Sequence, residues 1–288
     1  MAAPDIITHA GPLLSGYDLL LCDVWGVVHD GRRAHPAACE ALTRFRRDGG
    51  TVVLVSNAPM PCDAVARVLD DKKVDRAAWD AIVSSGDLAL TEIRARGYRR
   101  LHRIGPPGRD DDFFERLPGP DAPIATAEAI ACTGLRDDRA ERSQRYLPVL
   151  EAARARDLPF VCVNPDLVVH VGEDLLECAG AIAAIYERLG GSVFWAGKPH
   201  PVAYATAIAT AERLRGSAVG RSRILAIGDA VRTDLAAAKG AGVDALFIAS
   251  GIHREETMAG GQVDGAAVNR LVAAAGVEAR AAAAALVW

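Results

Sequence analysis

Three short polar segments of this chain each follow an apolar run that is typical of a buried strand. The run LLLC leads into Asp23, and the run TVVLV leads into Ser56 and Asn57. The run RILAI leads into a glycine and Asp229, with Asp234 five residues further on. A carboxylate at the end of a buried strand is costly unless it is paired, hydrogen-bonded or bound to a metal. Two such carboxylates next to a glycine turn favour a site for a hard cation such as Mg²⁺, which takes oxygen ligands.

A fourth segment, FWAGKPHP, places Lys198 between a glycine and a proline, and the chain has only three other lysines. Together the four segments offer a carboxylate nucleophile, hydroxyl and amide donors, one fixed cation and acids for a metal. Phosphoryl transfer through a covalent aspartyl-phosphate requires these groups. Taken singly, each segment keeps a plainer reading as a turn residue, a helix-capping acid or a solvated lysine.

The elements that must position these residues alternate between strand and helix patterns. Apolar runs predict strands at 17–28, 51–56, 81–84, 159–163, 223–227 and 245–248. Amphipathic stretches predict helices at 36–47, 62–69, 179–189, 201–213 and 233–241. This alternation predicts an α/β fold with a doubly wound, Rossmann-like parallel sheet. Ligands bind such sheets at the carboxyl ends of the strands, where the polar segments lie.

The middle of the chain breaks this regular pattern. Residues 105–120 (GPPGRDDDFFERLPGP) are rich in Gly, Pro and acid and predict a surface loop around a short helix. We expect residues 87–177 to form an inserted α/β cap domain, and residues 1–86 and 178–288 to form the core domain. The alanine-rich end, RAAAAALV at 280–287, favours a helix.

Composition narrows the class of protein. The 288 residues are 50% hydrophobic and 24% charged with a net charge of −4, as in an ordinary globular protein. This charge argues against a nucleic-acid binder that relies on a strongly basic field. No apolar run is long enough to span a membrane, and the first residues lack a signal-peptide layout. The six cysteines are scattered without a CxxC pair, which predicts reduced thiols of a cytoplasmic protein rather than zinc ligands or disulfides.

With these motifs in order, the sequence resembles the haloacid dehalogenase-like (HAD) hydrolase superfamily, class IIA, which includes NagD-like and p-nitrophenylphosphate phosphatase-like enzymes. The segment VNPDLVV at 163–169, Gly180 and the segment AGKPHPVAYATAI add to the resemblance. Ser56 and Lys198 lie 142 positions apart, which leaves room for the inserted cap. No GxGxxG follows the first strand, so a dinucleotide-binding oxidoreductase is disfavoured.

The resemblance implies a role for each candidate residue. Asp23 corresponds to the nucleophile and a Mg²⁺ ligand, and Ser56 and Lys198 correspond to residues that bind the transferring phosphoryl group. Asp229 corresponds to an acidic metal ligand and Asp234 to an acid that supports the metal site. The resemblance also places Asn57, Asn164 and Asp166 near the substrate. Gly26 follows Asp23 closely and allows the backbone to approach a ligand there.

One position departs from the family pattern. Phosphatases of the family carry D-x-D at the first motif, where the second Asp protonates the leaving oxygen, whereas this chain reads DVWGV with Trp25. The backbone carbonyl of Trp25 keeps the ability to bind a metal, but the proton donor is missing. General acid catalysis contributes about 10²–10⁴-fold. His29 and Asp30 are candidate replacements, and a plain polar turn is the alternative.

The sequence therefore predicts a Mg²⁺-dependent phosphatase that acts on a small phosphorylated metabolite of the sugar phosphate or nucleotide class. The alternative is a catalytically weak or inactive regulatory protein that binds a phosphorylated ligand on the same fold. Neither reading needs a nucleic acid or a membrane as partner, and a homodimer is compatible with both.

Overall fold

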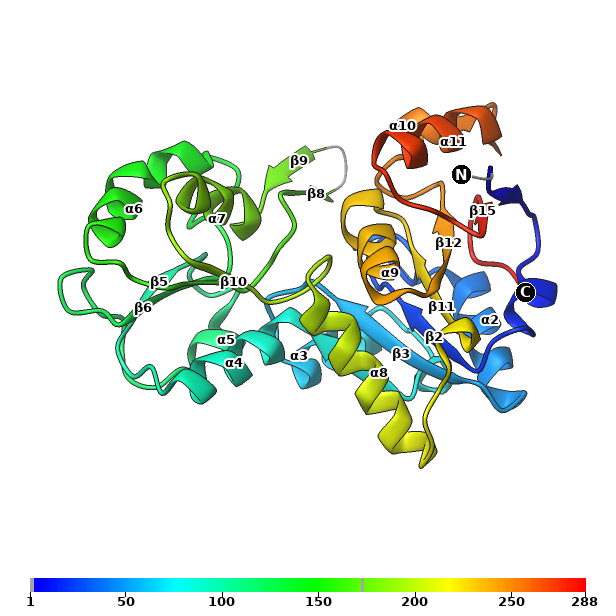
Figure 1. Cartoon of the computed structure of the whole chain (residues 1–288), viewed down its shortest axis with the longest axis horizontal. Helices are drawn as coiled ribbons and strands as arrows, with labels where there is room; N and C mark the ends of the chain where they lie inside the picture. The colour runs from blue at the N-terminus through cyan, green and yellow to red at the C-terminus, as the bar shows by residue number, and fades with distance from the viewer. Residues whose placement is uncertain (1–2, 172–173) are drawn as a thin grey trace. The chain divides into compact units, whose positions relative to one another are not determined.

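The computed structural model describes residues 3–171 and 174–288, which divide into two compact units (Figure 1). The first unit comprises residues 1–56, 66–83 and 198–288, and the second comprises 57–65 and 84–197. The chain therefore leaves the first unit and returns to it twice, and residues 84–197, the larger part of the second unit, are inserted between two segments of the first. Each unit is built around its own parallel sheet.

The first unit contains a seven-stranded sheet with the order β1-β15-β12-β11-β2-β3-β4. Its strands are β1 (Asp5–Ile6), β2 (Leu19–Cys22), β3 (Thr51–Ser56), β4 (Ala81–Ser84), β11 (Ile224–Gly228), β12 (Asp244–Ile248) and β15 (Ala281–Ala283). The pairings from β1 through to β3 are parallel. Every residue of β2, β3 and β11 is buried, as expected for strands covered on both faces.

The strand order reverses beside β2, which makes this sheet doubly wound, as predicted. The connection from β2 through α2 (Pro36–Arg47) moves outward to β3, whereas the connection from β11 through α9 (Ala236–Ala241) moves the other way to β12. Right-handed crossovers in opposite directions place their helices on opposite faces. α8 (Pro201–Arg215) packs against both α9 and the strands β2 and β3 (Figure 1). The switch point therefore falls between β2 and β11.

The second unit contains a four-stranded parallel sheet with the order β10-β7-β6-β5. Its elements are α4 (Ser85–Arg96), β5 (Leu101–Ile104), α5 (Asp111–Phe114), β6 (Ala129–Cys132), α6 (Leu147–Arg154), β7 (Phe160–Cys162), α7 (Ala179–Arg188) and β10 (Val193–Trp195). A two-stranded antiparallel sheet, β8 (Val168–Val171) with β9 (Asp174–Glu177), accompanies them. Aromatic and aliphatic side chains of β7, α6 and α7 form the core, where Tyr186 donates a hydrogen bond to the Leu158 carbonyl.

The predicted boundaries and the compact units differ over residues 178–197. These residues were expected in the core domain, but β10 pairs with β7 and α7 packs in the core of the second unit. The strong helical pattern of α7 gave no information about which sheet it covers. The second unit also includes residues 57–65, at the start of α3 (Cys62–Asp71).

The alanine-rich C-terminal stretch is a correction to the sequence analysis. It was expected to be helical, but Ala281–Ala283 form strand β15, which pairs with β12 and β1. All three alanines are buried, so backbone pairing inside the sheet outweighs the helical propensity of alanine. The predicted strand at 17–28 is also shorter, because β2 ends at Cys22 and a turn follows.

Short elements complete the chain. They are α1 (Gly11–Leu14), α10 (Arg254–Thr257), α11 (Gly265–Ala274), β13 (Met258–Ala259), β14 (Gln262–Val263), η1 (Arg76–Ala78), η2 (Ser143–Tyr146), η3 (Arg221–Arg223) and the π-helical turn η4 (Val231–Leu235). Among the residues that the structure describes, no helix combines the length and the apolar character that a membrane span needs.

Candidate active site

Three neighbouring strands of the first unit end in the candidate residues. β2 leads into Asp23, β3 ends at Ser56, and β11 leads into Asp229. β2 pairs with β11 on one side and β3 on the other, and the Asp23 amide donates a hydrogen bond to the Ile227 carbonyl. The sheet therefore places these residues at its carboxyl edge, beside the switch point.

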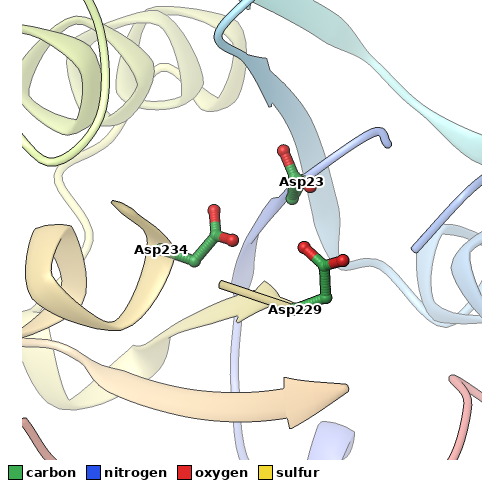
Figure 2. Close-up of side chains that lie close together, drawn as sticks. All are labelled: Asp23, Asp229 and Asp234. Atoms are coloured by element: carbon green, nitrogen blue, oxygen red, sulfur yellow. The ribbon is translucent and has the colours of Figure 1, made fainter. Parts of the chain in front are cut away.

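Lys198 joins two of the acids directly. Its Nζ donates a hydrogen bond to Asp23 Oδ1 at 2.5 Å and another to Asp234 Oδ1 at 2.7 Å. The Lys198 side chain is 2% exposed, and those of Asp23 and Asp234 are 12% and 2% exposed. Ligand atoms of Asp23, Asp229 and Asp234 all lie within 4.8 Å of one another. The three carboxyl groups face a common space (Figure 2).

Burial and crowding shift the pKa values of these groups. Burial raises the pKa of Asp23 to about 7, even though the Lys198 ammonium favours its charged form. Burial, followed by the negative charges of Asp23 and Asp234, raises the pKa of Asp229 well above its usual range. Burial alone lowers the pKa of Lys198, but the two carboxylates outweigh it and raise that pKa. The single Lys198 ammonium therefore does not balance the negative charge that the three carboxyl groups would carry when ionised.

This charge balance fits a divalent cation. Three carboxyl groups lie close together within the described part of the chain, and the Lys198 ammonium pairs with two of them, so ionisation of all three leaves an excess of buried negative charge. Carboxylate oxygens are the donors that Mg²⁺ prefers, and a bound Mg²⁺ keeps several waters as further ligands. The donor set of Asp23, Asp229 and Asp234 therefore suits a Mg²⁺ ion.

Glycines allow the backbone to approach Asp229 closely. A Cβ on Gly26 would lie 2.1 Å from Asp229 Oδ2, and a Cβ on Gly251 would lie 2.0 Å from the same atom. The backbone amide of Ile252 donates a hydrogen bond to this oxygen at 2.8 Å. Gly26 was predicted to allow a close approach to a ligand, and the structure assigns it this contact with the acid.

A π-helical turn presents Asp234. The turn η4 spans Val231–Leu235, and Asp234 Oδ2 accepts a hydrogen bond from the Ala230 amide at 3.1 Å. Such turns are rare and occur frequently at functional sites. The sequence prediction began a regular helix at residue 233, but the α-helix α9 starts only at Ala236. The wider turn directs Asp234 to Lys198.

The remaining predicted substrate-binding residues lie together in the second unit. Asn57 Nδ2 donates a hydrogen bond to Asp166 Oδ1 at 2.9 Å, and Asn164 Oδ1 accepts one from the Asp166 amide at 3.1 Å. Asn57 follows Ser56 directly at the first junction of the two units along the chain, and Gly197 precedes Lys198 at the last. Asn57 and Asp166 therefore fix each other, and their predicted contact with substrate stays a prediction.

The loop after Asp23 contains Trp25 and the two candidate proton donors. His29 is 3% exposed, and its Nδ1 accepts a hydrogen bond from the Gly31 amide at 2.9 Å. Burial lowers the pKa of His29 to about 4, so its ring is neutral at neutral pH. Asp30 accepts hydrogen bonds from two backbone amides, and these lower its pKa. Neither side chain therefore carries a proton suited to general acid catalysis at neutral pH.

Sequence reasoning missed the loop after β12. The segment SGIHRE follows that strand, and its Gly251 and Ile252 backbone holds Asp229. His253 Nε2 accepts a hydrogen bond from Val231 in η4 at 3.4 Å. The available signal was the position of this loop directly after the strand predicted at 245–248. The loop holds Asp229 through backbone groups, and these cannot be recognised from the types of the residues.

Comparison with known proteins gives the family. The chain matches the haloacid dehalogenase-like hydrolase model over residues 20–115 and the HAD-hydrolase-like model over residues 195–275. A solved haloacid dehalogenase-like family hydrolase from Brucella suis 1330 is 38% identical, with 98% of this chain and 100% of that chain covered and a TM-score of 0.85. The chain belongs to the haloacid dehalogenase-like hydrolase family. The predicted membership is confirmed.

Two more distant structures share the fold. The p-nitrophenyl phosphatase from Archaeoglobus fulgidus is 18% identical, with 92% of this chain and 95% of that chain covered and a TM-score of 0.69. NagD from E. coli K-12 is 20% identical, with 93% and 96% covered and a TM-score of 0.64. Both belong to the class that the sequence resembles. No curated protein matches the chain in sequence.

Proposed function

We propose that this HAD-family hydrolase is a Mg²⁺-dependent phosphatase that cleaves a small phosphorylated metabolite through an aspartyl-phosphate on Asp23. A sugar phosphate or a nucleotide is the proposed substrate class. The observation that supports this most is the contact of Lys198 with Asp23 and Asp234, beside Asp229. This arrangement combines a nucleophile, a fixed ammonium and an oxygen-rich cation site in one buried cluster.

The residues of the acid cluster and its neighbours have separate roles in the proposed reaction. Asp23, with its second carboxylate oxygen, attacks phosphorus, and Lys198 and Ser56 hold the oxygens of the phosphoryl group. The residues that would hold Mg²⁺ are Asp23, Asp229, the backbone carbonyl of Trp25 and, in support, Asp234. When bound, the ion would neutralise charge that develops on the phosphoryl oxygens. Ionised Asp23 is the reactive form, and a nearby cation favours that form.

The experiment that tests this function is a metabolite screen for Mg²⁺-dependent phosphate release, with Asp23→Asn as the blank. We expect release from at least one phosphate ester, abolished by a chelator and reduced about 10⁴-fold or more in the variant. Release that persists at the wild-type rate in Asp23→Asn would contradict the proposed nucleophile.

The missing acid predicts a dependence on the leaving group. No proton donor occupies position 25, so turnover of alkyl phosphates should be slow by about 10²–10⁴-fold relative to an enzyme with the acid. We expect kcat to fall steeply as the pKa of the leaving group rises, and Trp25→Asp to flatten that dependence. Fast turnover of alkyl phosphates by the wild type would mean that another residue donates the proton.

The alternative is a regulatory protein that binds a phosphorylated ligand without useful turnover, and Trp25 is the observation in its favour. It predicts ligand binding by calorimetry together with turnover no faster than that of Asp23→Asn. The retained set of Asp23, Lys198, Asp229 and Asp234 favours the enzyme.

Three further expectations accompany the proposal. The second unit serves as a cap that contributes Asn57, Asn164 and Asp166 to the substrate, and exchange of these residues should change KM more than kcat. The protein acts in the cytoplasm, consistent with six free cysteines. A homodimer is compatible with the proposal, and light scattering after gel filtration would reveal it as twice the monomer mass.

A further inference from the structure

The loop that follows β12 contacts two places on the segment from Asp229 to Asp234. Its Ile252 amide donates a hydrogen bond to Asp229 Oδ2 at 2.8 Å. The next residue, His253, accepts a hydrogen bond on Nε2 from the Val231 amide at 3.4 Å. Adjacent residues of this loop therefore hold the acid that follows β11 and the first residue of the π-helical turn η4, which carries Asp234.

The Val231 amide depends on the His253 side chain for its acceptor. Val231 is 3% exposed and begins η4, and the first amides of a helical turn have no acceptor within that turn. The His253 ring supplies the acceptor instead. A buried amide that loses its acceptor carries the full cost of its desolvation. Without the ring nitrogen, the start of η4 would therefore be driven to move towards another partner.

The His253 ring is held on its other side as well. Its Nδ1 lies 3.7 Å from Glu256 Oε1, and the ring packs against that of Phe247 with centroids 6.2 Å apart. Burial lowers the pKa of His253, so the ring is neutral at neutral pH. A neutral imidazole has one donor and one acceptor nitrogen. A proton on Nδ1, which faces the Glu256 carboxylate, leaves Nε2 as the acceptor for Val231.

The backbone of this loop is anchored beside the end of β12. Thr257 is fully buried, and its Oγ1 lies 2.8 Å from the carbonyl oxygens of Ala249 and His253. The loop also approaches Asp229 closely, since a Cβ on Gly251 would lie 2.0 Å from Asp229 Oδ2. His253 therefore has a fixed position from which to hold η4.

We propose that His253 is a positioning residue that raises the affinity of the acid cluster of Asp23, Asp229 and Asp234 for a divalent cation, an inference that rests on the cation site of the proposed function. His253 acts through Val231, because its acceptor nitrogen fixes the start of η4 and η4 sets the direction of the Asp234 carboxylate. Groups that orient metal ligands strengthen metal binding, since ligands already in place lose less conformational entropy when the ion binds.

The test measures the Mg²⁺ Kd of the folded protein by isothermal calorimetry, with magnesium chloride as the titrant. His253→Phe and the smaller His253→Leu both lose the acceptor, whereas His253→Gln can place an amide oxygen near the position of Nε2. His9→Phe is the matched control, because His9 Nδ1 also bonds a backbone group of the first unit, the carbonyl of Trp288. Thermal unfolding in a chelator establishes that each variant is folded.

We expect the Mg²⁺ Kd to rise about 10-fold in His253→Phe and His253→Leu, as when a group that supports a metal ligand is removed. His253→Gln and His9→Phe should bind Mg²⁺ as the wild type does. A purely structural role would lower the thermal stability of His253→Phe and His253→Leu and leave the Kd unchanged, and that result would overturn the proposal. An equal loss of affinity in His253→Gln or in His9→Phe would overturn it as well.

Failure of the proposed function gives a different result. Absence of Mg²⁺ binding by the wild type would remove the cation site, and this inference with it. Mg²⁺ binding by the wild type with an equal Kd in His253→Phe and His253→Leu would overturn the inference alone. The titration needs no turnover, so its outcome does not depend on finding the substrate.

Discussion

The acids that follow the strands of the two parallel sheets differ in how their negative charges are balanced. In the first unit, Asp23 and Asp229 follow neighbouring strands and share their surroundings with Asp234. One ammonium, Lys198, lies among these acids. The buried negative charge therefore exceeds the positive charge, and a cation would restore the balance.

In the second unit each of two acids that come after strands has a partner within the same unit. Asp110 follows β5, is 2% exposed and pairs with Arg109, which also reaches Asp138. Asp166 follows β7 and accepts a hydrogen bond from the Asn57 amide. Acids that come after parallel strands are thus common to both units, although Asp166 is only half-buried and Asp110 lies six residues past the end of β5. What distinguishes the candidate active site is the uncompensated charge, and this difference can be tested by removing each partner.

The largest expected effect comes from removing the buried ammonium. Lys198→Met leaves the Asp23 and Asp234 carboxylates without their partner, which should lower the free energy of unfolding by about 3–5 kcal/mol without metal. Urea unfolding in a chelator measures this loss, and phosphatase activity should disappear with it. Arg109→Met is the matched control in the second unit. The Arg109 side chain is 52% exposed, so we expect a loss of only about 1 kcal/mol. Equal losses in the two variants would remove the distinction between the units.

The next largest effect should come from Mg²⁺, which we expect to stabilise the protein through the acids of the first unit and not through those of the second. Binding to the folded state at about 100 times Kd adds about 2.7 kcal/mol, which raises Tm by roughly 5–10 °C. We expect Asp229→Asn to lose this response, since the variant lacks a predicted ligand. Asp110→Asn, which changes a buried acid of the other unit, should keep it. A Mg²⁺ response that survives in Asp229→Asn but not in Asp110→Asn would place the cation elsewhere.

Much of the fold and the site could be predicted from sequence because buried parallel strands are continuous apolar runs. β3 at Thr51–Ser56 and β4 at Ala81–Ser84 have the predicted limits, and α2 has the predicted range of Pro36–Arg47. Asp23, Asp229 and Lys198 were all selected from their positions after apolar runs or in a fixed turn. The ends of buried strands are therefore informative, because a charged residue there is costly unless it is paired, hydrogen-bonded or bound to a metal.

The missed features depend on contacts rather than on residue type. β10 (Val193–Trp195) is an apolar run of only three residues, so its pairing with β7 could not be predicted from its pattern. β15 is pure alanine, and only its neighbours in the sheet make it a strand. The backbone amide of Ile252 holds Asp229 without any chemical signature in the sequence. From the sequence alone, His29 and Asp30 were both candidates for the missing general acid. Burial lowers the pKa of His29 and backbone hydrogen bonds lower that of Asp30, so neither is suited to that role.

A smaller effect should come from the hydrogen bond between Asn57 and Asp166. A double-mutant cycle with Asn57→Ala and Asp166→Ala should give a coupling of about 1 kcal/mol, the contribution of one such bond. Urea unfolding of the wild type, both single variants and the double variant measures it. A coupling near zero would show that the pair is not formed in solution, and the internal compensation of the second unit would then rest on Arg109 alone.

The smallest effect concerns the pH dependence of Asp110. Burial raises the pKa of this carboxyl, although Arg109 favours its charged form. The folded state therefore holds the Asp110 proton more tightly than the unfolded chain does. The resulting stability is complete below about pH 4 and is lost as pH rises through the higher pKa of the folded state. Asp110→Asn removes this loss, so its stability relative to the wild type should improve as pH rises from about 4 towards neutrality. Urea unfolding across this range measures the difference, with the exposed Asp71→Asn as the control for loss of a negative charge. A relative stability that falls with rising pH would mean that Arg109 outweighs burial, and the two units would then differ even more sharply in how their buried acids are compensated.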